Sequence, residues 1–145
     1  MRKSWALGLA ICCTLLVVLL FIAGRMLYIK FDHQSYADIT DKTTQTSLIL
    51  TENQTEIATV SDPETVEGIT ALLQGYTYTQ YPHFFKPGEE KLGGNLLTVT
   101  FSNGNSIGVN ADGYVFVNGD LRDIEGSRGQ EFYHKLYQLF YPNAK

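Results

Sequence analysis

The feature that most constrains this chain is an apolar run close to its N-terminus. Trp5–Ala23 comprises nineteen residues without a carboxylate, an amine or an imidazole. A helix of this length is about 28 Å long at about 1.5 Å per residue, and the hydrocarbon core of a bilayer is about 30 Å thick. The pattern predicts a transmembrane anchor with its flanks over residues 1–30, in contact with membrane lipid through residues 5–23. Basic residues flank the run: Arg2, Lys3, Arg25 and Lys30.

A cleaved secretory signal is the alternative interpretation of the same run. Signal peptides usually have an apolar region of about 7–15 residues, followed by small residues at the cleavage site. This run is longer, and Ile22 occupies a position before Gly24 where a small residue is preferred. These features favour an uncleaved anchor. Cleavage near Gly24, with release of a secreted domain, stays the alternative.

The rest of the chain is acidic and contains no cysteine. From Phe31 to Lys145, seven Lys or Arg residues stand against fifteen Asp or Glu residues, which gives a net charge of −8. Cationic segments are held in the cytoplasm, and a domain without thiols tolerates an oxidising exterior. The composition therefore favours a single-pass protein of the cell membrane whose C-terminal domain lies outside. The same charge would repel a phosphate backbone, so binding to nucleic acid is not expected.

The acidic part divides into a stalk and one domain. Residues 31–46 are polar, rich in Asp and Thr and without clear periodicity, which is typical of a connecting segment. We interpret them as a polar stalk that lifts the domain off the membrane. Residues 47–145 are enough to bury one modest hydrophobic core, so we expect a single extracytoplasmic α+β domain there.

Turn signals within residues 47–145 predict a small antiparallel sheet of about five to six strands. Ser47–Thr51 and Thr55–Val60 form a first hairpin. Asp-Gly and Asn-Gly pairs supply the positive φ angles that tight turns need. Such pairs occur in the turns of a predicted three-stranded meander. Leu121–Ile124 is expected to add a short edge strand to it. The strands of the meander are Asn95–Phe101, Ser106–Ala111 and Tyr114–Val117.

Two amphipathic helices are expected to pack on this sheet. The first begins with one of two registrations: a capping box of Ser61 with Glu64, or Asp62 followed by Pro63 in the first turn. Its apolar residues recur on one helical face. The second helix spans Gln130–Tyr141 and ends before a proline, which cannot continue it.

An aromatic segment separates the first helix from the meander. Residues 76–94 are long for a connection in a compact domain, and long connections are often functional. Exposed aromatic side chains are enriched at contact surfaces, so we predict partner contacts here. In the alternative interpretation, the tyrosines near the start continue into a short strand and the phenylalanine pair fills the core. The predicted contact residues are Tyr78, Tyr81, Phe84 and Phe85.

The segment before the last helix has a composition that suits an anion. Gly126–Gly129 combines free backbone N–H groups at a helix start with the charge of Arg128, so Ser127 and Arg128 are candidate anion ligands. The alternative is that Ser127 simply caps the helix.

No other grouping predicts catalysis, a metal site or a cofactor. Gly104–Gly108 matches the G-x-S-x-G pattern of hydrolases, but a strand is expected after the serine where that motif requires a helix. His33, His83 and His134 lack the spacing of metal ligands. A small envelope hydrolase with His83 or His134 as general base stays the alternative.

The order of elements resembles a class of bacterial domains. The chain resembles small extracytoplasmic domains of Gram-positive membrane proteins and lipoproteins. The resemblance rests on the order anchor, stalk, hairpin, capped helix, glycine-turn meander and closing helix, and on the motifs at Val60–Glu64 and Ala111–Val115. The resemblance covers roughly Ser47–Tyr141 and implies a bacterial envelope setting without known catalytic residues. The helix-then-strands order also resembles PepSY domains, which are linked with regulating or inhibiting envelope proteases. The extra hairpin and the aromatic segment depart from that pattern.

Together these observations predict an anchored binding domain. The leading hypothesis is a single-pass membrane protein whose external domain binds a protein or peptide partner in the cell envelope and performs no chemistry. A small hydrolase and a PepSY-like regulator of an envelope protease are the alternatives.

Overall fold

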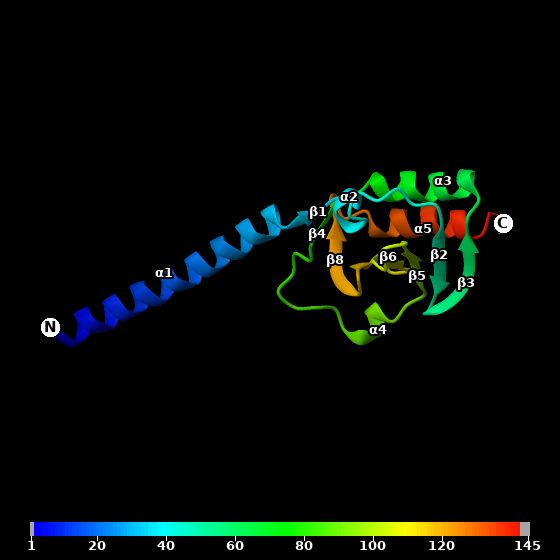
Figure 1. The fold of residues 1–145 in the computed structure, drawn as a ribbon. Helices are drawn as coiled ribbons and strands as arrows, with labels where there is room; N and C mark the ends of the chain where they lie inside the picture. The colour runs from blue at the N-terminus through cyan, green and yellow to red at the C-terminus, as the bar shows by residue number, and fades with distance from the viewer. Residues whose placement is uncertain (1, 143–145) are drawn as a thin grey trace. The chain divides into compact units, whose positions relative to one another are not determined.

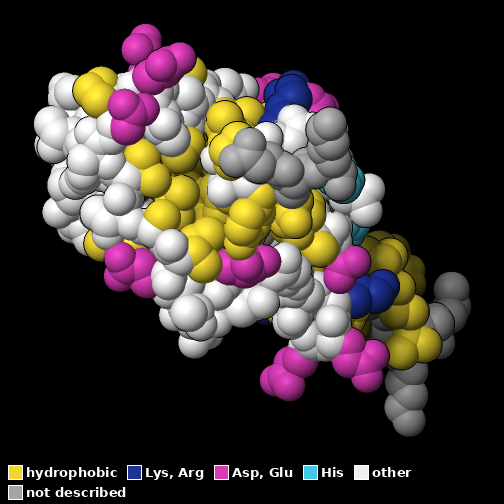
Figure 2. Space-filling model, turned by 90° about the vertical axis from the view of Figure 1, so that its right-hand side faces the viewer, with side chains coloured by type: hydrophobic (Ala, Val, Ile, Leu, Met, Phe, Trp, Pro, Cys, Tyr) yellow, Lys and Arg dark blue, Asp and Glu magenta, His cyan; other side chains and the backbone are white. Residues whose placement is uncertain are grey.

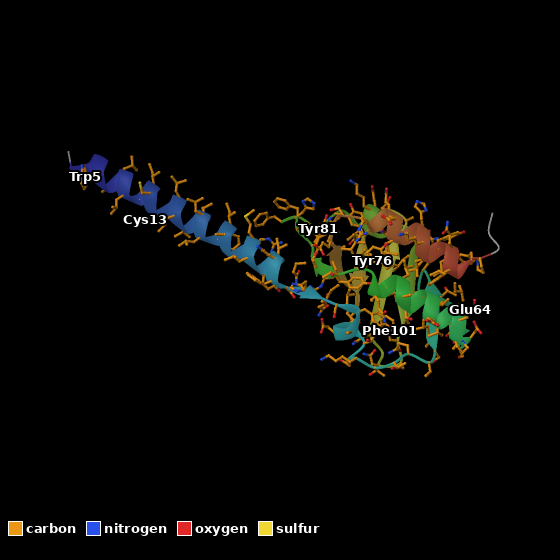
Figure 3. All side chains as sticks on the ribbon, turned by 90° about the horizontal axis from the view of Figure 1, so that it is seen from above. Trp5, Cys13, Glu64, Tyr76, Tyr81 and Phe101 are labelled. Atoms are coloured by element: carbon orange, nitrogen blue, oxygen red, sulfur yellow. The ribbon has the colours of Figure 1, made fainter. Side chains whose placement is uncertain are left out.

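The computed structural model describes residues 2–142 and divides into two compact units, Met1–Asp32 and His33–Lys145. The first unit is one long helix, α1 (Arg2–Phe31). Its segment Trp5–Phe31 is long and apolar enough to cross a membrane, by length and composition. Figure 3 shows its side chains projecting outward all round the helix. Thr14 lies within the apolar run, and its hydroxyl donates to the carbonyl of Ala10 (2.9 Å), so this polar group is satisfied inside the helix.

The second unit is an antiparallel sheet with helices, as predicted for the class α+β. In the described residues the sheet has eight strands in the order β1-β4-β8-β7-β6-β5-β2-β3. Figure 1 shows α3 and α5 crossing one face of this sheet side by side. The strands are β1 (His33–Gln34), β2 (Leu48–Glu52), β3 (Thr55–Val60), β4 (Tyr78–Gln80), β5 (Leu96–Thr100), β6 (Ser106–Asn110), β7 (Val115–Val117) and β8 (Asp120–Ile124). The helices are α2 (Tyr36–Ile39), α3 (Pro63–Gln74), α4 (Glu89–Leu92) and α5 (Gly129–Phe140).

The predicted count of five to six strands was too low. The two additional strands, β1 and β4, are two and three residues long. Strands this short are not visible as a periodic pattern. They also change the place of β8, which was expected at an edge and instead lies between β4 and β7. The edges of the sheet are β1 and β3.

The core lies between the sheet and the two long helices. Alternate residues of the central strands point toward the helices, and the apolar stripes of α3 and α5 meet them. Full burial of such a side chain contributes about 1.5–3 kcal/mol to folding, so this layer is the main stabilising contact. Fully buried members are Ile69, Leu73, Leu97, Val99, Ile107, Val109, Phe132 and Leu136.

Local signals set the turns and the first helix start as expected. Asn53 and Gln54 both adopt positive φ (49° and 67°) between β2 and β3, as a two-residue hairpin requires. Of the two registrations for α3, the structure contains the second: Asp62 is the N-cap and accepts from the N–H of Thr65 (3.0 Å), with Pro63 in the first turn. The hydrogen bonds that Asp62 accepts from the backbone N–H and the hydroxyl of Thr65 hold the pKa of Asp62 below its usual range.

Residues 33–46 form part of the second unit and are not a stalk. β1 pairs with β4, and α2 begins with a capping box in which Ser35 and Asp38 bond each other's backbone N–H. Tyr36 and Ile39 of α2 are buried in the core, where the Tyr36 ring packs edge-on against Phe101. A four-residue helix shows no periodicity, which is why this segment resembled a linker.

Polar side chains complete the docking of this segment. Gln45 accepts through Oε1 from the backbone N–H of Ser102 (2.9 Å). The amides of Asn103 and Asn105 both donate to the carbonyl of Ile39 (3.0 and 2.7 Å). The Gln45 side chain and the Ile39 carbonyl of the predicted stalk therefore bond to the β5–β6 turn.

One face of the second unit carries a gathering of hydrophobic side chains. Figure 2 shows it at the centre of the view, with Asp and Glu side chains around it. The partly buried hydrophobic residues that pack against the core are Ala58, Val60, Leu72, Tyr137, Leu139 and Tyr141. They come from the edge strand β3, from α3 and from the end of α5, so the apolar core reaches the surface near this edge.

Candidate functional site

A cleft of about 530 Å³ lies at the start of α5. Its walls come from the end of β4, the β6–β7 turn, β8 and the first turn of α5. The cleft brings together two groups of residues that the sequence predicted separately, namely Tyr81 and the pair Ser127–Arg128. The lining side chains used below are Tyr81, His83, Tyr114, Arg122, Ser127 and Arg128.

A close contact between two glycines shapes one wall of the cleft. Gly113, in the β6–β7 turn, has a φ of +84°, which favours glycine. Its backbone lies so close to Gly129 that a Cβ on Gly129 would come within 1.8 Å of the Gly113 carbonyl oxygen. Only hydrogen fits there, so the turn can lie directly against the first residue of α5. The sequence indicated Gly113 as a turn residue but gave no signal for this contact.

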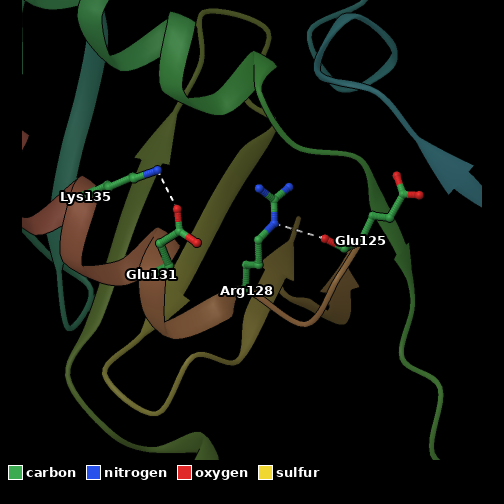
Figure 4. Close-up of polar contacts among 4 residues, drawn as sticks. All are labelled: Glu125, Arg128, Glu131 and Lys135. Carbon is green, nitrogen blue, oxygen red and sulfur yellow. Dashed lines mark hydrogen bonds and ion pairs between the residues drawn. The ribbon is translucent and has the colours of Figure 1, made fainter.

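Arg128 is held in the cleft by an aromatic ring and a carbonyl group. Its guanidinium carbon lies 5.1 Å from the centre of the Tyr76 ring, within cation–π range. Its Nε donates to the backbone oxygen of Glu125 (3.4 Å), as Figure 4 shows. The Tyr76 ring in turn packs on Phe132 of the core, with 4.8 Å between ring centres. The cation is thus positioned by the core and not by a flexible ion pair.

The cleft contains charges of both signs. Arg122 and Arg128 contribute cations, and Asp112, Asp123 and Glu131 contribute carboxylates. Glu131 pairs with Lys135 one turn later on α5, as Figure 4 shows, and this hydrogen bond lowers the pKa of Glu131. The pair is exposed, so it adds little stability.

Tyr81 is the aromatic centre of the cleft. Its ring lies 5.2 Å from the ring of His83 and 6.4 Å from that of Tyr114, measured between centres. Burial raises the pKa of the Tyr81 hydroxyl, and the neighbouring Tyr114 and Asp123 raise it further. Tyr81 therefore stays protonated at neutral pH and can donate a hydrogen bond to a ligand.

The four aromatic residues predicted as one contact surface lie in three different environments. Tyr78 is fully buried, and its hydroxyl donates to the carbonyl of Leu73 (3.0 Å), so the prediction of a surface contact was wrong for this residue. Tyr81 lines the cleft. Phe84 and Phe85 are 59% and 88% exposed and do not line it. The alternative interpretation was correct for the strand and wrong for the phenylalanine pair.

The predicted anion ligands are only partly suited to that role. The backbone N–H of Ser127 donates to the carbonyl of Ile124 (3.0 Å), so it is already used within the turn. Ser127 also does not cap the helix, because Arg128 occupies the N-cap position. Of this pair, the Arg128 side chain is the group that can meet an anionic part of a ligand.

The histidines lie in different parts of the chain: His33 in β1, His83 between β4 and α4, and His134 in α5. In the part of the chain that the structure describes, no group of three or more His, Cys, Asp or Glu residues could hold a metal ion. His134 lies exposed on α5 beside Tyr133. His83 lines the cleft together with Ser127 and with carboxylates. His83 is thus the histidine whose position suits the alternative of a general base.

Comparison with known proteins gives no family assignment. No family model matches the chain, and neither a curated protein nor a solved structure matches it. The resemblance to Gram-positive extracytoplasmic domains and to PepSY domains therefore stays a prediction.

Proposed function

We propose that this protein is a single-pass membrane protein whose external domain binds a protein or peptide partner of the cell envelope in the cleft at α5. The observation that carries the proposal is the meeting of Tyr81, Arg122 and Arg128 in one cleft, although they come from three separate segments. No catalytic step is part of the proposal.

The anchor is supported by α1 and by the chemistry of the second unit. Trp5–Phe31 is sufficient in length and apolarity to span a bilayer. Both cysteines, Cys12 and Cys13, lie in this helix, and the acidic second unit has none. Such a domain has no thiol to oxidise outside the cell.

Peptide binding is supported by the residue types in the cleft. Tyrosine and arginine are the side chains most enriched at protein contacts, because each combines a large apolar area with directed hydrogen bonds. Arg128 lies over Tyr76, and Tyr81 packs beside Tyr114, so each contact group has an aromatic neighbour within the domain. A peptide with an acidic side chain next to an aromatic one fits this arrangement.

Site-specific crosslinking in intact cells tests the partner site. A photoreactive phenylalanine derivative at Tyr81 should capture one discrete partner, and Arg128→Ser should reduce that adduct at least tenfold. The matched control carries the same group at Ile57 on β3, at the other end of the sheet. The PepSY-like order of elements makes an envelope protease the first partner to test. Equal capture from both positions, or capture that does not respond to Arg128→Ser, would contradict the proposal.

Cysteine labelling tests the topology. In a background with Cys12→Ser and Cys13→Ser, a single Glu64→Cys substitution places a thiol at the exposed start of α3. A membrane-impermeant maleimide should label it in intact cells to the same extent as in lysed cells. Labelling only after lysis would show that the domain lies in the cytoplasm.

Hydrolysis is the second candidate function, favoured by the presence of His83, Ser127 and carboxylates among the residues that line the cleft. If the purified protein cleaves ester or peptide substrates, His83→Gln should abolish turnover, while His134→Gln should leave it unchanged. If both variants keep full activity, the cleft is not the hydrolytic site.

A further inference from the structure

The segment between β4 and α4 exposes two phenylalanines. Residues 81–88, which we call the aromatic loop, contain Phe84 and Phe85 at 59% and 88% exposure. Outside α1, these are the most exposed large hydrophobic side chains among the described residues, ahead of Ile49 and Ile57 at 39%. Leaving an aromatic ring in water forgoes the favourable free energy of its burial. Adjacent exposed rings therefore mark a contact surface.

Strand pairing places the start of this loop beside β1, at the beginning of the second unit. α1 ends at Phe31, and β1 begins two residues later at His33. β4 is antiparallel to β1, with His33 opposite Thr79. Because paired strands lie about 4.8 Å apart, the chain leaves β4 for the loop next to the first residue of the second unit.

The composition of the aromatic loop differs from that of the surrounding domain. It carries Lys86 and no acidic residue, whereas residues 31–145 have a net charge of −8. Tyrosine favours the headgroup level of a bilayer, phenylalanine favours the adjoining acyl region, and lysine is attracted to anionic lipid. Pro82 and Pro87 lie near the two ends of the loop and restrict the backbone, which lowers the entropy lost on insertion.

We propose that the aromatic loop inserts Phe84 and Phe85 into the leaflet from which α1 emerges, with Lys86 at the lipid phosphates. This inference rests on the proposed anchor. Tethering by α1 keeps the loop near the lipid at a high effective concentration, so two rings are sufficient for a stable contact. A second copy of the chain is a less favourable occupant, because two acidic domains repel each other. The contact would hold the domain, and the cleft that shares Tyr81, at the membrane surface.

Depth-dependent quenching in the full chain tests this proposal. The protein is placed in vesicles of phosphatidylcholine and phosphatidylglycerol that contain lipids spin-labelled near the headgroup. Phe85→Trp in a Trp5→Phe background should be quenched strongly by these lipids. The matched control, Ile57→Trp in the same background, lies on β3 at the far edge of the sheet and should not be quenched. Phe85→Trp quenched no more than Ile57→Trp would overturn the inference.

Two further measurements separate the ways in which the test can fail. In the wild-type chain, Trp5 is the single tryptophan and reports on α1 itself. Trp5 is the first residue of the apolar run, so in an anchored helix it lies near the headgroup level. If lipid spin labels near the headgroup do not quench Trp5, the proposed anchor fails. If they do and Phe85→Trp stays unquenched, only the loop inference fails. Phe85→Trp shielded from aqueous iodide but not quenched by lipid would indicate a protein contact, and would also overturn the inference.

Charge reversal tests the part played by Lys86. Lys86→Glu in the Phe85→Trp, Trp5→Phe chain should lower the quenching in vesicles with anionic lipid, and much less in vesicles of phosphatidylcholine alone. An unchanged near-UV circular dichroism spectrum shows that each variant is folded. Quenching that is the same with Lys86 and with Lys86→Glu in anionic vesicles would contradict the assignment of the lysine to lipid phosphates.

Discussion

At the scale of single residues, Glu52 links three elements through its carboxylate. Asn95 donates to its Oε1 from the loop before β5 (2.6 Å), and the hydroxyl of Tyr141, just after α5, donates to its Oε2. These bonds hold the pKa of Glu52 below its usual range, and the same contact raises the pKa of Tyr141 to about 12. Charge-assisted bonds of this kind fix the end of α5 to the sheet.

The lowered pKa of Glu52 predicts a loss of stability in acid. A depressed carboxyl pKa adds stability above the unfolded value of about 4.3, and that stability disappears as the pH falls through the folded pKa. Tyr141→Phe removes the main cause, so the unfolding free energy should fall by about 1 kcal/mol or less at neutral pH and depend less on pH in acid. Urea unfolding of the full chain in micelles from neutral to acidic pH measures this.

Tyr137→Phe is the control for this prediction. Its ring packs against Tyr141, with 4.9 Å between centres, but it does not bond Glu52. The pH dependence of its unfolding should match that of the wild type. If Tyr137→Phe and Tyr141→Phe behave alike, the effect comes from ring packing and not from the carboxylate.

At the scale of elements, short segments make long-range contacts with the core. α2 has four residues, yet it buries Tyr36 and Ile39 and receives hydrogen bonds from Asn103 and Asn105. Because its contacts are made with distant parts of the chain, its stability comes from tertiary packing and not from helix propensity.

Ile39→Ala tests whether this segment is part of the core. Ile39 is buried, so its truncation should cost about 2–5 kcal/mol of unfolding free energy through lost burial and a residual cavity. Thr44→Ala, at an exposed position of the same segment, should change stability by less than about 0.5 kcal/mol. Chemical denaturation of both variants measures the difference. Equal, small effects would return residues 33–46 to the role of a stalk.

Alanine substitutions at Gly129 and Gly68 should change the stability of the protein in opposite directions, because only Gly129 lies against the backbone of Gly113. Gly129→Ala places a Cβ against the backbone of Gly113, so the turn and α5 must separate, at a cost of about 1–3 kcal/mol. Gly68→Ala in α3 meets its nearest atom at 4.0 Å and removes a flexible residue from a helix, so it should stabilise by up to about 1 kcal/mol. Thermal unfolding of both variants gives the two signs. A neutral Gly129→Ala would contradict the described wall of the cleft.

At the scale of the whole molecule, the chain consists of two units with different means of stabilisation. The first unit contains the helix α1 (Arg2–Phe31), whose apolar surface is exposed, and His33–Lys145 has its own core. The second unit keeps a six-residue edge strand, β3, next to the apolar area of Figure 2. An exposed edge can recruit further strands, and a net acidic surface opposes that association between copies.

Hydrogen exchange should show the two units opening independently. In micelles with increasing urea, the amides of β1 and α2 should lose protection together with those of β5 and β6, because they belong to one cooperative unit. The amides of α1 should stay protected, since detergent covers this helix. Exchange of residues 36–40 well before the central strands would contradict the assignment of this segment to the second unit.

Much of the fold was predictable because its signals are local. The apolar length of residues 5–23, the turn at Asn53–Gln54 and the start of α3, at one of its two possible registrations, each depend on residues a few positions apart. The strands β2, β3, β5, β6 and β7 follow from alternation between such turns. These features were indicated by the sequence, with the two helices close to their observed bounds.

The position of the candidate site residues depended on contacts that no local pattern encodes. Tyr78 and Tyr81 are three residues apart in a segment of alternating tyrosines, yet one is core and the other lines the cleft. Pairing of β4 with β8 decides this, and the two strands are more than forty residues apart in the chain. The cleft also needs Gly113 to lie against Gly129.

The apolar run and the turns were thus determined by the sequence alone, because each is a short-range preference of the backbone or of a side chain for its surroundings. The place of residues 33–46, the two short strands and the cleft were decided only by the tertiary structure. Their stabilising groups are hydrogen bonds and packing contacts across long stretches of chain, such as Gln45 with Ser102 and Arg128 with Tyr76. Such contacts form only when the sheet brings the two partners together.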